Sequence, residues 1–312
     1  MRFVIIGPGF GEIPPKGWGA VEILIWDYKQ TLEEKGHEVL IVNKPNKNDI
    51  ILEVNNYNPD IVHIHYDDWW YIWNDFNCKK VIITNHYAYM ECPHRRNFDF
   101  VEGITRSGLI IHCLSEGIKN VYLSYGVSES RLFVLQNGAN EKLFKYKENP
   151  KNKEKSLYLA KIDYRKRQKI YQNIECIDFV GNIADTEFNP NCSNYLGEWS
   201  KEQLYENLTE YSALVLLSDG EAHPLVCCEA LVSGLGLVVS EFAAANLDRS
   251  KPYITVIPTD KLNDIEYIQK ELWRTQKIGI TMRNEIRKYG LEKFSWSNVI
   301  DKYLIHTKNL LY

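Results

Sequence analysis

The stretch "LLSDGEAHPLVCCEALVSGLGLVVSE", residues 216–241, carries the signals of a strand, a loop, a helix and a second strand. An apolar run ends at Ser218, and a short loop with Glu221 follows. Pro224 stands where the helix would begin, and proline is favoured in the first turn of a helix. This order predicts a β–α–β unit. Glu221 is then expected at the carboxyl end of a strand and Glu229, with seven residues between the two, near the middle of the helix.

Short apolar runs of the same kind recur along the whole chain and alternate with helical patterns. Because most of these runs are continuous rather than alternating, they predict parallel strands that are covered on both faces. The expected strands are residues 2–7, 38–42, 60–66, 80–87, 109–115, 131–140, 156–162, 176–183, 213–218, 235–241 and 253–258.

The strand pattern is interrupted once by a charged segment, "KYKENPKNKEK" at residues 145–155. Its composition predicts a linker. We therefore expect a first α/β domain over residues 1–145 and a second over 156–294. A C-terminal helix over 295–312 is expected to return to the first domain. Ligands bind outside the carboxyl ends of such sheets, so the expected site is a cleft between the domains.

Composition excludes several classes of protein. The 312 residues suffice for two domains, and the 45% hydrophobic content excludes a disordered chain. A formal net charge of −4 gives no indication of a nucleic-acid partner. No apolar run reaches the roughly 18 residues that a membrane-spanning helix needs. The first residues, "MRFVIIG", predict a buried strand rather than a signal peptide.

The seven cysteines are odd in number and form no C-x-x-C pair. Several stand inside apolar runs, so we expect reduced thiols and a cytoplasmic location. A zinc site would have Cys78, His86, Cys92 and His94 as its ligands, but their spacing matches no standard zinc pattern. The expectation is therefore that no metal is bound.

The glycines near the N-terminus raise the question of a dinucleotide fingerprint, G-x-G-x-x-G. Gly7 and Gly9 fit its first two positions, but Glu12 occupies the third. The prolines at 14–15 prevent a helix from leaving the turn directly, whereas the fingerprint needs a helix N-terminus there. A nicotinamide or flavin site is excluded on this ground. The first helix is expected over residues 20–35.

The quoted stretch resembles the E-x(7)-E signature of glycosyltransferase family 4, the retaining sugar-nucleotide transferases of the GT-B fold. Further segments resemble landmarks of that family in the family's order, so the resemblance extends over almost the whole chain. These segments are "PPKGWGAVE" (14–22), "PDIVHIH" (59–65), "VIITNH" (81–86), "VLQNGANEKLF" (134–144), "LAKIDYRKRQ" (159–168) and "YLGEWSKEQLYENLTEYSALVLLS" (195–218).

The resemblance implies an α/β GT-B fold with two Rossmann-like domains. It also implies transfer of a hexose from a UDP- or GDP-sugar to a hydroxyl of a glycan or glycoconjugate, with retention of configuration. No cofactor or metal is expected, because cations of the protein would stabilise the leaving diphosphate. The expected catalytic residues are Glu221, Lys166, Lys161 and His86.

The same resemblance implies a set of donor-binding residues. Glu229 would accept hydrogen bonds from the ribose hydroxyls, and backbone N–H groups at two helix starts would face the diphosphate or the sugar. The expected donor-binding residues are Glu229, Gly17, Gly19, Ala20, Ala222, His223, Pro224, Leu225, Leu196 and Gly197. Arg167 stands where the family commonly has glycine.

Two other functions stay open at this point. One is a GT-B sugar-nucleotide epimerase or hydrolase, and the other is a non-catalytic carbohydrate-binding protein. The expected partners are a nucleotide sugar and a glycan or glycoconjugate, with peripheral membrane contact open and no nucleic acid. The aromatic segment "DDWWYIW" (67–73) is a candidate for the acceptor site or for core packing. The base, the sugar and the acceptor are not specified by the sequence.

Overall fold

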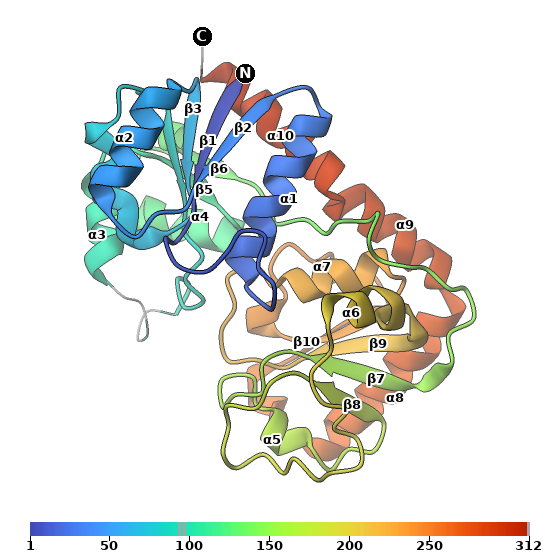
Figure 1. The fold of residues 1–312 in the computed structure, drawn as a ribbon. Helices are drawn as coiled ribbons and strands as arrows, with labels where there is room; N and C mark the ends of the chain where they lie inside the picture. Colours follow the sequence, from blue (N-terminus) through green and yellow to red (C-terminus); the bar gives the residue numbers. More distant parts are fainter. Residues whose placement is uncertain (93–94, 96–97, 311–312) are drawn as a thin grey trace. The chain divides into compact units, whose positions relative to one another are not determined.

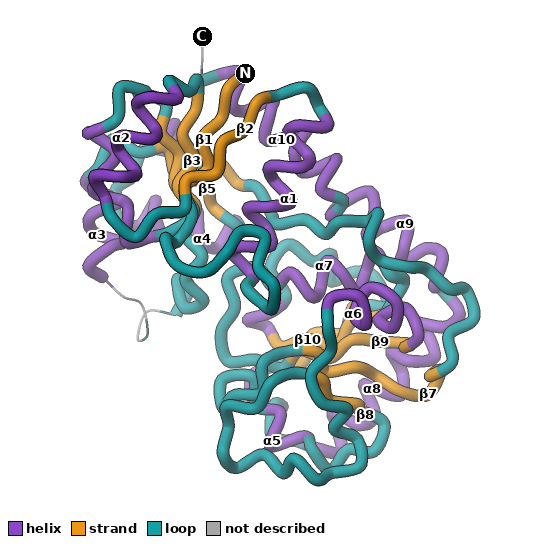
Figure 2. Tube along the Cα trace, in the orientation of Figure 1, coloured by secondary structure: helices purple, strands orange, loops and turns teal. Residues whose placement is uncertain are grey.

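The computed structural model describes residues 1–92, 95 and 98–310, and the chain divides into two compact units. Unit 1 comprises Met1–Asn137 together with the C-terminal residues from Trp296 onward, and unit 2 comprises Gly138–Ser295. Each unit is a parallel sheet with helices packed against it (Figures 1 and 2). The predicted α/β class is confirmed.

In unit 1 six strands form one sheet in the order β2-β1-β3-β4-β5-β6, with all neighbouring strands parallel. The elements in chain order are β1 (Arg2–Ile6), α1 (Ala20–Glu34), β2 (Glu38–Val42), α2 (Lys47–Tyr57), β3 (Ile61–Ile64), the 3-10 helix η1 (Asp67–Asp75), β4 (Val81–Thr84), α3 (Phe98–Arg106), β5 (Ile110–Cys113), α4 (Glu116–Ser124), η2 (Glu129–Arg131), β6 (Leu132–Val134) and, near the C-terminus, α10 (Trp296–Asn309).

In unit 2 five parallel strands follow the order β11-β10-β9-β7-β8. The elements are β7 (Asn152–Leu159), α5 (Gln168–Tyr171), β8 (Ile177–Val180), α6 (Lys201–Asn207), η3 (Leu208–Glu210), β9 (Tyr211–Leu216), α7 (Leu225–Val232), β10 (Gly236–Ser240), η4 (Glu241–Ala243), β11 (Ile254–Ile257), η5 (Thr259–Lys261), α8 (Ile265–Thr281) and α9 (Arg283–Phe294).

The continuous apolar runs predicted from the sequence form the central strands of both sheets. Every residue of β3, β4, β8, β9 and β10 is buried. Such burial requires cover on both faces of the sheet. Figure 1 shows that α1 and α10 lie on one side of the unit 1 sheet, with α2 and α3 on the other.

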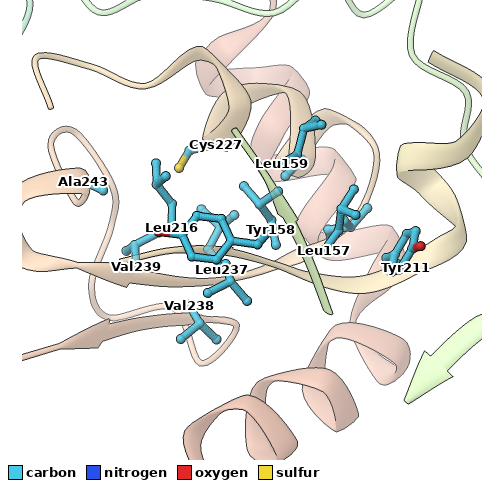
Figure 3. Close-up of a cluster of buried hydrophobic side chains, with 14 of the residues drawn as sticks. Leu157, Tyr158, Leu159, Tyr211, Leu216, Cys227, Leu237, Val238, Val239 and Ala243 are labelled. Atoms are coloured by element: carbon cyan, nitrogen blue, oxygen red, sulfur yellow. The ribbon is translucent and has the colours of Figure 1, made fainter. Parts of the chain in front are cut away.

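The core of unit 2 is built from strand side chains and the helix that carries the E-x(7)-E segment. Figure 3 shows residues of β7, β9 and β10 gathered with Cys227 of α7 in one apolar cluster. Cys227 and Cys228 are both buried, and burial raises the pKa of each thiol. These cysteines are therefore packing residues, and their buried helix face fixes the position of α7.

Helix α10 belongs to unit 1 although it follows unit 2 in the sequence. Trp296 is only 2% exposed, and its ring centroid lies 4.9 Å from that of Tyr28 in α1. The hydroxyl oxygen of Tyr303 lies 3.1 Å from Nδ1 of His63 in β3. Buried aromatic contacts thus tie this helix to the first helix and the sheet of unit 1.

The division between the units differs from the expected linker. The units separate between Asn137 and Gly138, and residues 152–155 of the expected linker already belong to β7. The first half of this strand is partly exposed and charged, and Lys153 and Glu154 are exposed. An exposed strand end carries no apolar signal, so its sequence resembles a linker.

The glycine loop after β1 supports the exclusion of a dinucleotide fingerprint. Helix α1 begins at Ala20, well after the prolines. Gly9 has a φ of +89°, and a Cβ at this position would lie 2.4 Å from the carbonyl oxygen of Lys44. The N–H of Gly9 also donates to Oδ1 of Asn43 at 2.7 Å. The first glycines therefore allow close packing of the loop against the segment after β2.

Candidate active site

The strand order of unit 2 defines where a ligand would bind. The chain leaves β7 toward β8 on one side and then returns to β9 on the other side. At such a switch point the loops after the two neighbouring strands diverge, and ligands bind outside their carboxyl ends. The loops in question are residues 160–167 after β7 and 217–224 after β9.

These two loops bring Lys166 and Glu221 together. The ammonium group of Lys166 donates to Oε1 of Glu221, and Nη1 of Arg165 lies 3.2 Å from the same oxygen. The side chains of Lys166 and Glu221 are each only 11% exposed. One carboxylate with two cations leaves a net charge of +1 in a sheltered position. An anionic group of a ligand is therefore attracted to this cluster.

A second ion pair connects the same loops. Nη1 of Arg167 donates to Oδ1 of Asp219 at 3.0 Å, and its guanidinium also bonds to Oδ1 of Asn263 and the hydroxyl of Tyr171. Arg167 has a φ of +61°, the left-handed conformation in which glycine is favoured. The arginine therefore keeps the backbone shape expected of the family's glycine and adds a link to Asp219.

A buried tyrosine forms a hydrogen bond to the backbone at Lys166. The hydroxyl of Tyr158 in β7 donates to the carbonyl of Lys166 and accepts from the N–H of Leu217 at 2.9 Å. The N–H of Lys166 donates to Oδ1 of Asp163 at 2.9 Å. Because one hydroxyl bonds to both loops, the positions of Lys166 and Glu221 are fixed before any ligand arrives.

Lys161 lies in the same loop but outside this cluster. Its side chain is exposed, and its ammonium group forms no ion pair with any residue that the structure describes. Its carbonyl accepts from the side-chain amide of Gln168 at 2.9 Å, which fixes the backbone at this point. Lys161 is thus a cation at the edge of the site with its charge available to a ligand.

The N-terminus of α7 lies in the loop that carries Glu221. Pro224 is the N-cap residue, and no side chain among the described residues caps the first N–H groups of the helix. Ala222 and Leu225 are half-buried. His223 is buried, and burial together with Lys293 lowers the pKa of its imidazole to about 3. His223 is therefore neutral at physiological pH and unsuited to act as a general acid.

Glu229 lies in the second turn of α7 and is half-buried. Its neighbours Cys228 and Ala230 are buried, so the carboxylate lies on the edge of the helix face that packs into the core. At the carboxyl end of β8, the carbonyl of Gly197 accepts from the N–H of Gly181 at 3.0 Å. Leu196 beside it is 43% exposed. The expected donor-side residues of unit 2 thus follow the carboxyl ends of β7, β8 and β9.

In unit 1 the expected donor contacts lie at the start of α1. Gly19 is the N-cap residue of this helix and Ala20 its first residue, and none of the side chains that the structure describes caps the helix. Nothing lies within 4 Å of a Cβ built on Gly17. The loop therefore presents uncapped backbone N–H groups, which suit an anion.

The switch point of unit 1 lies between β1 and β3, and polar side chains gather after β3 and β4. Nδ1 of His65 lies 3.1 Å from Nε2 of His86. Burial lowers the pKa of His86 to about 4, so its ring is neutral at physiological pH. The carboxyl of Asp67 accepts a hydrogen bond from the backbone of His86, while burial and the charge of Asp68 raise its pKa to about 8.

Arg165 was not among the predicted site residues, and Asp67 was included only as part of the aromatic segment 67–73. Asp67 directly follows an expected strand, and that position was the available signal, but the neighbouring aromatic residues obscured it. Trp70 and Trp73 of the same segment pack against α3 and the residues after it, because a Cβ on Gly103 or Gly108 would meet their rings at 2.3 and 2.6 Å. Within this segment, packing therefore accounts for these two tryptophans.

The zinc alternative finds no support among the described residues. No three His, Cys, Asp or Glu side chains of that part of the chain come together as metal ligands. His94, one of the four residues considered, lies outside the described residues.

Residues 44–143 match the model of a protein family described as Glycosyltransferase Family 4. This match covers 100 of the 312 residues. The resemblance drawn from the sequence is thereby confirmed, and with it the enzyme class, a glycosyltransferase. No curated protein matches the sequence significantly.

Solved structures of GT-B glycosyltransferases match the fold over nearly the full length. Sucrose-phosphate synthase from Thermosynechococcus elongatus has a TM-score of 0.79 at 15% identity, covering 99% of this chain and 98% of that one. HepE from Anabaena, in complex with UDP and glucose, has a TM-score of 0.72 at 13% identity, covering 99% and 100%. The lipopolysaccharide outer core galactosyltransferase WaaB scores 0.69 at 16% identity, covering 98% and 99%. The predicted GT-B fold is confirmed.

Within the described part of the chain, no helix is long and apolar enough to cross a membrane.

Proposed function

We propose that this glycosyltransferase moves a hexose from a UDP- or GDP-sugar to a hydroxyl of a glycan or glycoconjugate, with retention of configuration. The observation that carries the proposal is the sheltered cluster of Lys166, Arg165 and Glu221 at the switch point of unit 2. It offers positive charge for a diphosphate and a carboxylate for sugar hydroxyls. The complex of HepE with UDP and glucose supports a nucleotide sugar as the donor.

The leaving diphosphate determines the role proposed for the cations. As the glycosidic bond breaks, negative charge grows on the diphosphate, and fixed cations stabilise that charge. We assign this role to Lys166 and Lys161. In unit 2 the uncapped helix start at Leu225 adds backbone N–H donors. In unit 1 we propose the loop with Gly17, Gly19 and Ala20 as a separate anion-binding segment.

The surroundings of Glu221 bear on the route by which the proposed retention would occur. A carboxylate that accepts hydrogen bonds from both Lys166 and Arg165 is a weakened nucleophile, because its charge is already neutralised. We therefore propose that Glu221 holds a hydroxyl of the donor sugar. The acceptor then attacks the face that the diphosphate leaves, and the departing phosphate takes the acceptor proton. His86 and Asp67 in unit 1 are the proposed acceptor-side residues.

The two glutamates provide the test of this proposal. If Glu229 accepts from the ribose hydroxyls, Glu229→Ala should weaken binding of the nucleoside diphosphate. A charged hydrogen bond contributes roughly 1.5–3 kcal/mol, so the loss should be on the order of ten- to a hundredfold. Glu221→Gln should not weaken this affinity, because it removes no cation, and should lower turnover instead. Calorimetric titration beside a transfer assay measures both effects.

Glu206→Ala is a suitable control, because this exposed carboxylate pairs with Lys145 on the surface of unit 2. It should change neither binding nor turnover. If Glu221→Gln loses nucleotide binding and Glu229→Ala keeps it, the two roles are exchanged. If neither variant differs from the control, the proposed donor site is wrong.

Acceptor dependence separates transfer from the two alternatives. A transferase releases the nucleoside diphosphate in step with the acceptor supplied. An epimerase or hydrolase would convert the donor without any acceptor, and a carbohydrate-binding protein would leave it intact. Release of UDP or GDP, followed with and without a glycan acceptor, therefore distinguishes the three functions.

Metal independence is a further part of the proposal. Lys161, Arg165 and Lys166 offer three cations for the diphosphate, which is the role that a divalent ion would otherwise fill. Transfer activity should persist in EDTA. Complete loss of activity in EDTA, restored by magnesium or manganese, would contradict the proposal.

A further inference from the structure

Unit 2 contains a pocket that the proposed reaction does not use. Its volume is about 870 Å³, and it is bounded by the start of β7, the segment 173–176 before β8, and α8. The proposed donor site follows the carboxyl end of β7, whereas this pocket lies at the amino end. The eight residues of that strand span about 26 Å, so the two sites are well separated.

The wall formed by α8 carries an exposed tryptophan. Trp273 is 58% exposed and lines the pocket. The ammonium nitrogen of Lys277 lies 3.6 Å from the centroid of the ring and covers one face of it. An indole ring supported in this way offers a flat apolar platform beside polar groups, an arrangement that suits the C–H face of a sugar ring.

The charged side chains that line the pocket balance one another and are not taken up in ion pairs with described residues. Two lysines, Lys153 and Lys277, and two glutamates, Glu154 and Glu175, line the pocket. None of the four forms an ion pair with any residue that the structure describes. Balanced charge gives no preference for an anion or a cation, and these side chains offer both hydrogen-bond donors and acceptors beside the apolar lining.

We propose that this pocket binds a neutral oligosaccharide. One sugar ring stacks on Trp273, and its neighbours receive hydrogen bonds from the lysines and the amides of Asn173 and Gln269 and donate to the glutamates. The volume is within the usual range for small-ligand sites, about 300–1,000 Å³. Through this second site the enzyme keeps a glycan chain on its surface without using the donor site.

The test uses the full chain on an array of neutral and anionic glycans, without nucleotide sugar. Wild type and Glu221→Gln are expected to retain the same neutral glycans. Trp273→Ala should weaken this binding at least tenfold, and Trp273→Phe should recover most of it. Tyr125→Ala removes another partly exposed aromatic ring, at the end of α4 in unit 1, and should have no effect.

Several outcomes would overturn the proposal: no retention of any neutral glycan, equal retention by Trp273→Ala, or a preference for anionic glycans. Sedimentation of wild type and Trp273→Ala completes the test, because a dimer that the substitution dissociates would make the pocket a contact between copies. Since Trp273 is on the surface, its variants should unfold at the same urea concentration as wild type. Normal transfer by Trp273→Ala to a short acceptor keeps this test separate from that of the donor site.

Discussion

Arg167 holds a left-handed backbone conformation that usually belongs to glycine, and its side chain compensates for the cost. A residue with a Cβ loses about 1 kcal/mol in this conformation. The guanidinium in return bonds to Asp219, Asn263 and Tyr171. The link between the two loops of the proposed donor site therefore depends on this side chain, although the backbone would prefer another residue.

Two substitutions of Arg167 separate the backbone cost from the side-chain gain. Arg167→Ala loses the hydrogen bonds and keeps the unfavourable conformation, whereas Arg167→Gly loses the bonds but relieves the backbone. In urea unfolding, Arg167→Ala should be less stable than Arg167→Gly by about 1 kcal/mol, and both should be less stable than wild type. Equal stability of the two variants would show that the conformation costs nothing here. Arg106→Ala, with a side chain that is 77% exposed, serves as the control.

Helix α10 shows how much one element contributes to unit 1. Trp296, Val299, Ile300 and Tyr303 are all buried on its inner face. Truncating a buried tryptophan typically costs about 3–5 kcal/mol, so Trp296→Ala should strongly lower the stability of unit 1. Ile305→Ala on the outer face, where the side chain is 63% exposed, should change it by less than about 0.5 kcal/mol. Circular dichroism during urea unfolding measures both, and comparable losses would contradict the packing described.

The elements that could be predicted from the sequence are the strands whose residues are nearly all apolar, because this composition indicates burial. Strands such as Val81–Thr84 are apolar at nearly every position, so their place in a covered sheet followed directly. The exposed start of β7 gave no such signal. The contact between Lys166 and Glu221 joins residues 55 positions apart, and only the neighbouring positions of β7 and β9 in the sheet bring them together. The left-handed conformation of Arg167 could not be predicted either, because it depends on tertiary partners.

The stability of the molecule should depend on pH through the histidines of unit 1. His63, His65 and His112 are buried and His86 is half-buried. Desolvation lowers the pKa of each, to about 4 for His86 and about 3 for His112. The folded state then binds fewer protons than the unfolded state, so stability falls as pH falls from about 6.5 toward 3. Asp67, whose pKa is raised, acts in the opposite direction, but it is one group against four.

His112 allows this dependence to be measured at a single position. Neither ring nitrogen has a hydrogen-bond partner within the described residues, and the ring stacks on Phe133 with centroids 5.1 Å apart. Phenylalanine fills the same space without a proton to bind. Relative to wild type, His112→Phe should gain about 2 kcal/mol in unfolding free energy between pH 8 and pH 5. Parallel pH profiles of the two proteins would contradict this expectation.

The position of α10 also sets an order of events during synthesis. All of unit 2 is synthesised before α10, the helix that completes unit 1. After Asn137, more than 150 further residues must be translated before α10 can pack against the sheet of unit 1. Until then the surface that receives Trp296 and Tyr303 is exposed to water. A domain that is begun first and finished last is exposed to chaperones and proteases for longer than the domain nested inside it.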